Sequence, residues 1–311
     1  MDRKITDIDV RDAFFGELYK SIKKDNKIIL LTVDQGALAI NKIKRDFPNN
    51  YFNIGIFEQT AINFAAGLAH QGFKPYVYLI SSFVLRALEQ IKINLCSMNT
   101  KVVIVASGPG FTYASDGPTH YFNEDYGILK NFPNLNFFCT SDYLSAIRSF
   151  NESYKSKNPC YIRLEKGSNP RINGNLKNSV NHAIKSNDVL VISNGNLSLL
   201  VKKIIDENAV LKHNVGLADI TQFIPLNIKK IENIVKDYNK IILLDESPML
   251  SSINVDIYNK LKINKKFNDK KIIFMNTLFR FWKISGKRSF LYKKNKIDEN
   301  SIKSKLLKLI D

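Results

Sequence analysis

Short runs of apolar residues alternate along the chain with longer stretches in which apolar residues recur every three or four positions. The short runs are almost continuously apolar, as in KIILLTV (27–33) and KVVIVAS (101–107). Strands of this kind are buried on both faces, and strands that alternate with helices build parallel sheets that helices cover on both sides. The pattern therefore predicts an α/β fold.

The polar segment 167–187, which is rich in Asn, Gly and Ser, divides this pattern into two parts. Before it, the expected strands are 27–33, 51–56, 75–80, 101–107, 135–140 and 160–164, and the expected helices are 9–24, 58–71, 83–96 and 142–155. After it, the expected strands are 188–193, 213–220, 240–246 and 271–276, and the expected helices are 197–208, 228–238, 253–261 and 298–311.

This arrangement predicts two three-layer α/β domains with largely parallel sheets. The first domain covers residues 1–166, and the second covers residues 188–311. The segment 167–187 reads as the linker between them, because its composition favours turns over regular structure. We find no internal repeat.

Polar side chains at the carboxyl ends of the strands are the candidates for chemistry, because ligands of open α/β sheets bind there. They are Glu58, Ser81, Ser82, Phe83, Arg86, the loop 107–125, Arg163 and Lys166. Taken singly, most have a structural explanation: Glu58 suits the first turn of a helix, and Phe83 suits a core. Their convergence from separate strands on one sheet edge is more informative than any one of them.

The loop 107–125, SGPGFTYASDGPTHYFNED, is the hardest of these to explain structurally. A long glycine-rich loop inside a compact domain is usually functional. It carries Asp116 and His120, and the chain has only 4 histidines. A histidine at such a place suits ligand contact or proton transfer about as well as it suits a structural role.

Charge and cysteine content bear on the binding partners and the cellular compartment of the protein. The formal net charge of +17 favours anionic partners, although the lysines are scattered and form no dense block. The three cysteines, Cys96, Cys139 and Cys160, fit neither a disulfide framework nor a zinc site. The N-terminus has no apolar signal core, and no apolar run is long enough to span a membrane. We therefore expect a cytoplasmic protein without membrane contact.

Several common motifs are absent from the sequence. The chain has no GxxxxGK[ST] loop, no GxGxxG turn after a strand, and neither an HExxH nor a CxxC motif. It consequently shows no phosphate cradle of its own, and we expect no metal ligands in this chain.

The stretch NIGIFEQTAINFAAGLAHQGFKPYVYLISSFVLRALEQI (53–91), followed by SDGPTH (115–120), resembles the pyrimidine-binding domain of transketolases and of the related deoxyxylulose-phosphate synthases. The resemblance continues through ISNGN (192–196) and IILLDE (241–246), so it covers nearly the whole chain. The motif around Glu58 combined with DGPTH is specific, whereas either alone would be weak.

The resemblance implies thiamine diphosphate as cofactor and assigns the residues that would hold it. Glu58 would hydrogen-bond the N1′ nitrogen of the aminopyrimidine ring and favour its imino tautomer, which activates the cofactor. Phe83 would stack on this ring, and Ile56 and Arg86 would complete its surroundings. The carbanion chemistry would belong to the cofactor, while the protein orients and polarises it.

The resemblance also implies a sugar site. Asp116 and His120 would contact the hydroxyls or the carbonyl of the substrate, and His120 would take part in catalysis with Glu58. Arg11, Arg163 and Lys166 would bind substrate as well, and Arg86 and Arg163 look more like the synthase branch.

Two positions depart from standard transketolases. A family histidine falls on Gly108, and a phosphate-binding serine falls near Leu38. We therefore expect a substrate pocket that differs from the pocket of a pentose-phosphate transketolase.

Family members are about twice this length and begin with a domain that binds the diphosphate through a GDG motif and a metal ion. No GDG occurs here. The resemblance thus implies the C-terminal subunit of a split transketolase, with a partner chain that carries the diphosphate domain and holds most of the ligands of Mg²⁺ or Ca²⁺. The expected assembly is α2β2, and the expected reaction moves a two-carbon ketol unit from a ketose or ketose phosphate to an aldose.

Two other classes stay open. The chain could be a subunit like deoxyxylulose-phosphate synthase or like the β subunit of a 2-oxo-acid dehydrogenase, although DGPTH favours sugar chemistry. It could also be a non-catalytic regulatory or basic binding subunit. Binding to nucleic acid is not expected, because the basic residues accompany no groove-reading or stacking motif.

Overall fold

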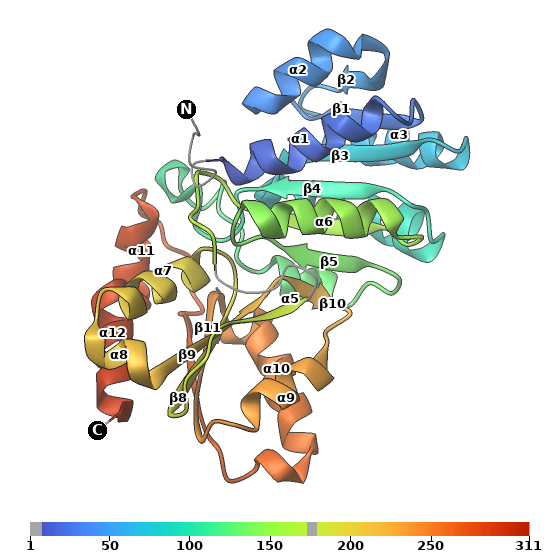
Figure 1. The fold of residues 1–311 in the computed structure, drawn as a ribbon. Coiled ribbons are helices and arrows are strands. Elements are labelled where there is room, and N and C mark those ends of the chain that lie inside the picture. Colours follow the sequence, from blue (N-terminus) through green and yellow to red (C-terminus); the bar gives the residue numbers. More distant parts are fainter. Residues whose placement is uncertain (1–7, 173–178, 311) are drawn as a thin grey trace. The chain divides into compact units, whose positions relative to one another are not determined.

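The computed structural model describes residues 8–172 and 179–310 (Figure 1). Its contacts divide the chain into two units. The first comprises the described residues up to Pro109 together with Leu129–Pro170, and the second comprises Gly110–Ile128 and the described residues from Arg171 onward. The loop that carries Asp116 and His120 thus belongs to the second unit, while Glu58, Phe83 and Arg86 belong to the first.

The first unit is a parallel sheet with helices on both faces. Its strands lie in the order β5-β6-β4-β3-β1-β2 and all run parallel to their neighbours. The strands are β1 (Ile28–Thr32), β2 (Tyr51–Asn53), β3 (Lys74–Ile80), β4 (Val103–Ser107), β5 (Asn136–Cys139) and β6 (Cys160–Leu164).

Alternate residues of these strands face opposite helical layers, as the pleat of a strand requires. Tyr76, Tyr78, Val103 and Val105 share a core with α1 (Val10–Ile22), α2 (Leu38–Asp46) and α6 (Tyr143–Lys155). The helix α3 (Glu58–His70) packs on β3 and on the 3₁₀ helix η3 (Ser81–Ala87). Ala61, Ala65 and Ala66 are buried on α3, so small side chains let this helix approach the sheet closely.

The helix expected over 83–96 is not continuous, and this part of the prediction is wrong. The 3₁₀ helix η3 ends at Ala87, a single α-helical turn α4 (Leu88–Gln90) follows, and a π-helix η4 (Ile91–Ser97) completes the segment. Ser81, Val84 and Ala87 are buried with a spacing of three, which is the period of a 3₁₀ helix. The burial pattern of η3 therefore follows a tighter helix than the sequence analysis assumed.

The second unit is a five-stranded sheet in the order β12-β11-β8-β9-β7, in which only β7 runs antiparallel. Its strands are β7 (Val180–Ile184), β8 (Val189–Ser193), β9 (Val215–Ile220), β11 (Lys240–Pro248) and β12 (Lys271–Thr277), and a short strand β10 (Gln222–Ile224) follows β9. The helices are α7 (Gly195–Asp206), α8 (Ala209–Asn214), α9 (Ile228–Val235), α10 (Ile253–Ile263), α11 (Arg288–Asn295) and α12 (Glu299–Ile310). In Figure 1, α7, α8, α11 and α12 lie on one side of this sheet, and α9 and α10 lie on the other.

The predicted fold class is confirmed by these two largely parallel sheets with helices on both sides. One element departs from the domain plan, because β7 lies inside the range 167–187 that was expected to be a linker. Only Val180 of this strand is fully buried, so β7 lacks the continuous apolar run by which the other strands were predicted. Residues 173–178 of the expected linker lie outside the described residues.

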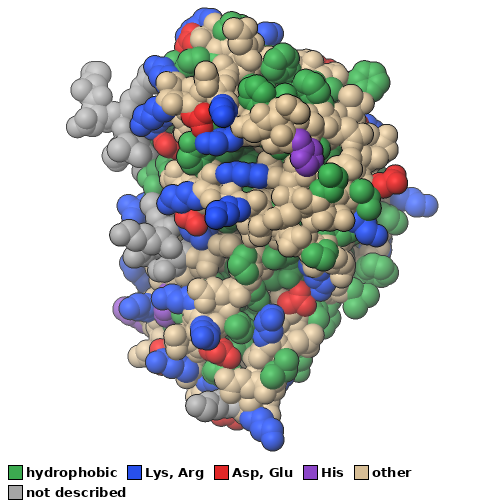
Figure 2. Space-filling model, turned by 90° about the vertical axis from the view of Figure 1, so that its right-hand side faces the viewer, with side chains coloured by type: hydrophobic (Ala, Val, Ile, Leu, Met, Phe, Trp, Pro, Cys, Tyr) green, Lys and Arg blue, Asp and Glu red, His purple; other side chains and the backbone are tan. Residues whose placement is uncertain are grey.

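The basic side chains on the face drawn in Figure 2 do not gather in a single block. Figure 2 shows Lys and Arg side chains spread over the visible face, with acidic and hydrophobic side chains among them. This agrees with the scattered lysines of the sequence. None of the helices in the described part of the chain combines the length and the apolar character that crossing a membrane requires.

Candidate active site

Glu58 is the first residue of α3 and is 4% exposed. The strand β2 ends at Asn53, and the chain turns through Gly55, whose φ of 74° is a left-handed conformation that favours glycine. Phe57 then occupies the N-cap position without a side-chain capping bond. A carboxylate in the first turn is favoured by the helix dipole, yet burial of a carboxylate requires a partner.

That partner is Arg86 on η3. Its Nη1 donates to Oε1 of Glu58 at 2.8 Å, and its guanidinium lies 4.4 Å from the centroid of the Phe83 ring. The side chain of Arg86 is 53% exposed, whereas that of Glu58 is 4% exposed. Three of the predicted residues are thus brought together: a buried carboxylate, an aromatic ring and a half-exposed arginine between them.

Several exposed apolar side chains lie on the elements that carry this group and on the adjoining η4. Ile56 and Phe57, which precede Glu58, are 63% and 64% exposed. Phe64 on α3, Leu85 on η3 and Ile93 on η4 are also exposed. Since α3 contacts η3 and η4, these side chains come from neighbouring elements of the first unit. Exposed apolar residues that gather in this way are typical of an interaction surface.

Arg11 lies apart from this group in a local ion pair. Its Nη2 contacts Oδ2 of Asp9 at 2.9 Å, and Asp9 also accepts from the backbone N–H of Arg11 and of Gly167. Burial opposes the charge of Asp9, but the hydrogen bonds and charge of Arg11 outweigh it and lower the pKa of Asp9 below its ordinary value. Arg11 therefore organises the start of α1, and its substrate role stays a prediction.

Arg163 and Lys166 differ in their surroundings. Arg163 on β6 is 4% exposed, and its guanidinium lies 5.7 Å from the centroid of the Phe137 ring. Lys166 follows β6 and is exposed. Their roles toward a substrate likewise stay predictions.

Asp116 and His120 lie in one tight turn of the second unit. Asp116 ends the 3₁₀ helix η5 (Ala114–Asp116) and is exposed, and Gly117 follows with a φ of 78°. The N–H of His120 donates to the carbonyl of Gly117 at 3.1 Å, and Nδ1 of His120 lies 2.9 Å from Oγ1 of Thr119. The turn therefore carries an exposed carboxylate and a half-buried imidazole four residues apart, and their roles toward a sugar stay predictions.

Sequence reasoning missed two residues that support this loop, Glu246 and Arg288. Glu246 accepts a hydrogen bond from the N–H of Phe111 and forms an ion pair with Arg288. The one signal in the sequence was an acid at the end of the apolar strand 240–246. Nothing in the sequence connects it to a loop 135 residues earlier.

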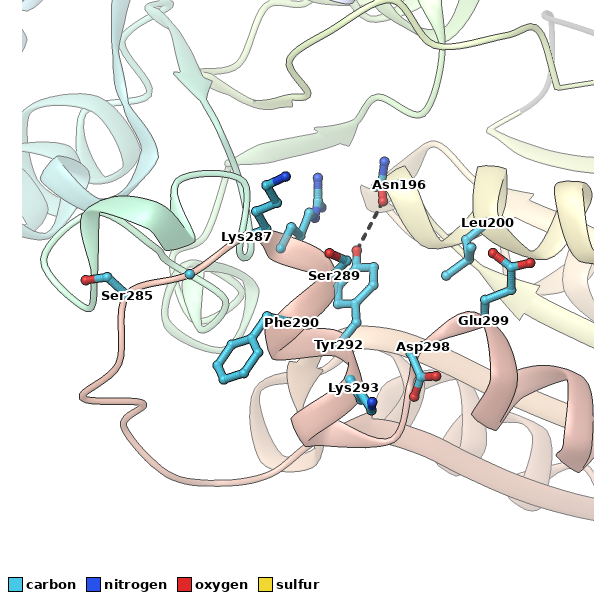
Figure 3. A pocket seen from close by; sticks show the side chains of 12 residues that line it. Asn196, Leu200, Ser285, Lys287, Ser289, Phe290, Tyr292, Lys293, Asp298 and Glu299 are labelled. Atoms are coloured by element: carbon cyan, nitrogen blue, oxygen red, sulfur yellow. Dashed lines mark hydrogen bonds between the residues drawn. The ribbon is translucent and has the colours of Figure 1, made fainter.

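A cavity of about 870 Å³ lies in the second unit beside α11 (Figure 3). Leu200 and Phe290 line it together with the charged residues Lys287, Arg288 and Glu299. Asn196 accepts a hydrogen bond from the hydroxyl of Tyr292 at its wall. The sequence analysis named none of these residues.

No group of three or more His, Cys, Asp or Glu side chains suited to a metal ion occurs within residues 8–172 and 179–310. The three cysteines are buried, and burial raises the pKa of the Cys96 and Cys160 thiols to about 11. These two thiols are therefore protonated near neutral pH and suit packing rather than nucleophilic chemistry.

Comparison with known proteins identifies a family and shows how much of its relatives' length this chain covers. A family model described as "Transketolase, pyrimidine binding domain" matches residues 6–171. The 1-deoxy-D-xylulose-5-phosphate synthase of Aliarcobacter butzleri is 27% identical over 255 residues, which cover 80% of this chain and 41% of that protein. The synthase of Clostridium perfringens (strain SM101) is 23% identical over 310 residues, which cover 96% and 49%. The chain thus spans about half the length of the curated relatives it matches.

Solved structures show the same fold. A structure titled "Split gene transketolase, inactive beta4 tetramer" matches with a TM-score of 0.83 at 18% identity and covers 97% of this chain and 98% of that chain. Transketolase from Campylobacter jejuni matches with a TM-score of 0.78 at 17% identity and covers 99% and 48%.

Proposed function

Because the chain belongs to the family of transketolase pyrimidine-binding domains, we propose that it is the C-terminal subunit of a two-chain, thiamine-diphosphate-dependent transketolase. The enzyme would move a two-carbon ketol unit from a ketose or ketose phosphate to an aldose-type acceptor. The observation that carries this proposal is the buried carboxylate of Glu58 beside Phe83 and Arg86.

These residues fit the pyrimidine half of the cofactor. A buried carboxyl group can hold a proton between its oxygen and a ring nitrogen, and Phe83 offers an aromatic face on which a flat ring can stack. Arg86 balances the charge of Glu58 and, being half exposed, can adjust when the carboxyl group takes a new partner. When bound, the cofactor supplies the carbanion chemistry, while this chain binds and orients its pyrimidine ring.

The sugar would be handled by the loop of the second unit. Asp116 would accept hydrogen bonds from substrate hydroxyls, and His120 would donate to or accept from the substrate carbonyl or hydroxyl. Arg163, Lys166 and Arg11 are the candidates for an anionic group of the substrate, because guanidinium and ammonium groups bind phosphate.

We also propose a partner chain that supplies the diphosphate and metal site, in an α2β2 assembly. The exposed apolar side chains around Glu58, from Ile56 to Ile93, support this, since an unpartnered surface of this kind is costly in water. A chain titled as a split-gene transketolase shares this fold over nearly its whole length, which supports a separate partner chain.

A synthase-like function is the second candidate, and the names of the curated relatives favour it. Such an enzyme would use pyruvate as donor, whereas a transketolase uses a ketose phosphate. Product analysis of the assembled enzyme with each donor separates the two. A ketol product from the ketose phosphate supports the first proposal, and a product from pyruvate alone supports the second.

The central claim is tested by Glu58→Gln in the assembled enzyme. We expect turnover to fall about 10²–10⁴-fold, the usual contribution of a positioned proton-transfer group, with the fold intact. Glu152→Gln on α6 is the matched control, because Glu152 is exposed and belongs to neither the proposed site nor the proposed partner surface. Near-normal turnover of Glu58→Gln would remove the claim.

A further inference from the structure

The loop that carries Asp116 and His120 is closed at its base by an antiparallel bridge. The N–H of Gly110 donates to the carbonyl of Phe122 at 3.0 Å, and the N–H of Phe122 donates back at 3.1 Å. Phe111, Ala114 and Tyr121 are buried in the core of the second unit. The C-terminal sheet and its helices therefore decide how this loop is held.

Glu246, near the end of β11, contacts both ends of the loop. Its Oε1 accepts from the N–H of Phe111 at 2.7 Å, and its carbonyl accepts from Nδ2 of Asn123 at 3.2 Å. Nδ2 of Asn123 also lies 3.3 Å from Oγ1 of Thr277 on β12. The side chain of Glu246 thus holds the entry of the loop at Phe111, 135 residues earlier, and its backbone carbonyl holds the exit at Asn123.

Gly110, at the entrance of the loop, leaves room for the Glu246 carboxylate. Gly110 has a φ of 57°, and a Cβ added there would lie 2.5 Å from both Cδ and Oε2 of Glu246. That separation is far inside van der Waals contact, and the left-handed conformation also favours glycine. Glycine at this position therefore permits the close approach of the Glu246 carboxylate, independently of the hydrogen bonds.

Arg288, the first residue of α11, holds the carboxylate in place. Its Nε donates to Oε1 of Glu246 at 2.9 Å, and its Nη2 forms an ion pair with Oε2. The two side chains are 16% and 9% exposed, so water screens this bidentate pair only slightly. The guanidinium also lies 5.7 Å from the centroid of the Tyr292 ring and lines the cavity of Figure 3.

The segment before α11 adds two further supports. The N–H of Trp282 donates to the hydroxyl of Tyr121 at 2.9 Å, and the N–H of Gly286 donates to the carbonyl of Ala114 at 3.2 Å. The loop is thus supported at Ala114 and Tyr121 as well as at its base. Asp116 and the turn to His120 lie between these supported points.

We propose that Glu246, braced by Arg288, is a positioning residue that holds the loop so that Asp116 and His120 meet the substrate. This inference rests on the proposed function, because that function gives the loop its substrate. Glu246 touches the backbone of the loop and acts through it. We call the contacts of Glu246 with Phe111 and Arg288 the clamp. Loosening the clamp should impair turnover of the sugar and leave the binding of thiamine diphosphate unchanged.

The test uses the assembled enzyme with Glu246→Ala, Glu246→Gln and Arg288→Lys. We expect Glu246→Ala to lower kcat/KM for the sugar about 10–100-fold, as small misplacements of positioned groups do. The Kd of thiamine diphosphate should stay within about twofold, since Glu246 is not placed at the pyrimidine. Glu246→Gln keeps an acceptor for Phe111 and should recover part of the loss. Asp206→Ala, in an exposed pair with Lys202 on α7, is the control and should change nothing.

Hydrogen exchange gives a readout that does not depend on turnover. In Glu246→Ala the amide of Phe111 should exchange about tenfold faster or more, because its buried hydrogen bond to a charged acceptor is lost. The amide of Phe122 should also exchange faster, because its partner Gly110 precedes Phe111 and loses that support. Unchanged exchange in a folded Glu246→Ala variant would overturn the clamp. Faster exchange with unchanged kcat/KM would overturn its role in positioning the substrate. If the wild-type enzyme turned over no donor, the proposed function would fail, and the exchange rates would still decide whether the clamp exists.

Discussion

At the scale of single residues, Asp9 shows how one carboxylate organises a helix start. It caps α1, accepts from Gly167 and pairs with Arg11. Its pKa is lowered below 3.8, so its charge stabilises the folded chain above that pH, and the stabilisation is lost as the pH falls through the lowered pKa. We expect Asp9→Asn to cost roughly 1 kcal/mol of unfolding free energy at pH 7, since the amide keeps the cap but loses the charge.

Urea unfolding of both proteins at pH 7, 5 and 4 checks this expectation. The difference between wild type and Asp9→Asn should be constant from pH 7 to 5 and begin to shrink near pH 4. Asp269→Asn, at an exposed position, is the control and should leave the unfolding free energy unchanged. A difference that grows as the pH falls would contradict the assigned pKa direction.

Residues near one another in sequence were within reach of prediction, and distant partners were not. Glu58 follows β2, and Phe83 and Arg86 follow β3, the next strand in the chain, so the rule that sites lie at the carboxyl ends of strands selected them together. Glu246 and Arg288 escaped, because their role depends on a contact with Phe111 that no local pattern encodes. The substrate roles of Asp116 and His120 rest on resemblance and stay predictions.

At the scale of elements, the antiparallel pair of β7 and β9 is supported by a tyrosine that the sequence of β7 does not reveal. The hydroxyl of Tyr238, which follows α9, accepts from the N–H of Ser186 at 3.0 Å and lies 3.0 Å from Nε2 of His182. A Cβ on Gly216 of β9 would lie 2.4 Å from this hydroxyl. Gly216→Ala should therefore displace Tyr238 and lower the unfolding free energy by about 1–3 kcal/mol.

A double-mutant cycle with Tyr238→Phe measures that coupling. The phenylalanine removes the clashing hydroxyl. The double variant should therefore be more stable, by about 0.5 kcal/mol or more, than the sum of the two single losses predicts. Strict additivity of Gly216→Ala and Tyr238→Phe would show that the hydroxyl does not set the distance between β9 and Tyr238.

The strands were predictable because burial on both faces makes them continuously apolar, and each predicted strand is present in the structure. Elements with a polar composition were missed: β7 lies in an Asn-rich segment, and α11, RSFLYKKN, has no clear apolar period. The segment 83–96 misled the analysis for the opposite reason. Its apolar residues fit an α-helical period well enough to hide the 3₁₀ and π-helical geometry that the structure adopts.

At the scale of the whole molecule, the contacts that our proposal assigns to this chain and the cofactor would be too few for tight binding. One carboxyl hydrogen bond contributes about 1–3 kcal/mol, and one aromatic face contributes about 1 kcal/mol. Together they reach about 4 kcal/mol, which corresponds to a Kd of about 1 mM even before the entropy lost on binding. The proposed partner must supply the remaining binding energy through the diphosphate and its metal ion.

Calorimetric titration of thiamine diphosphate with Mg²⁺ into this chain, into a candidate partner and into their mixture tests that division. We expect Kd values of about 1 mM or weaker for this chain alone and at least about 100-fold tighter binding by the mixture, because separate contacts act together once both chains are joined. Phe83→Ala in this chain should weaken binding by the mixture about fivefold, in keeping with the loss of one stacking contact. Phe73→Ala, a partly exposed aromatic that follows α3, is the matched control and should leave the Kd unchanged. Tight, Mg²⁺-dependent binding by this chain alone would end the two-chain proposal, because the residues that hold the diphosphate would then lie within these 311 residues.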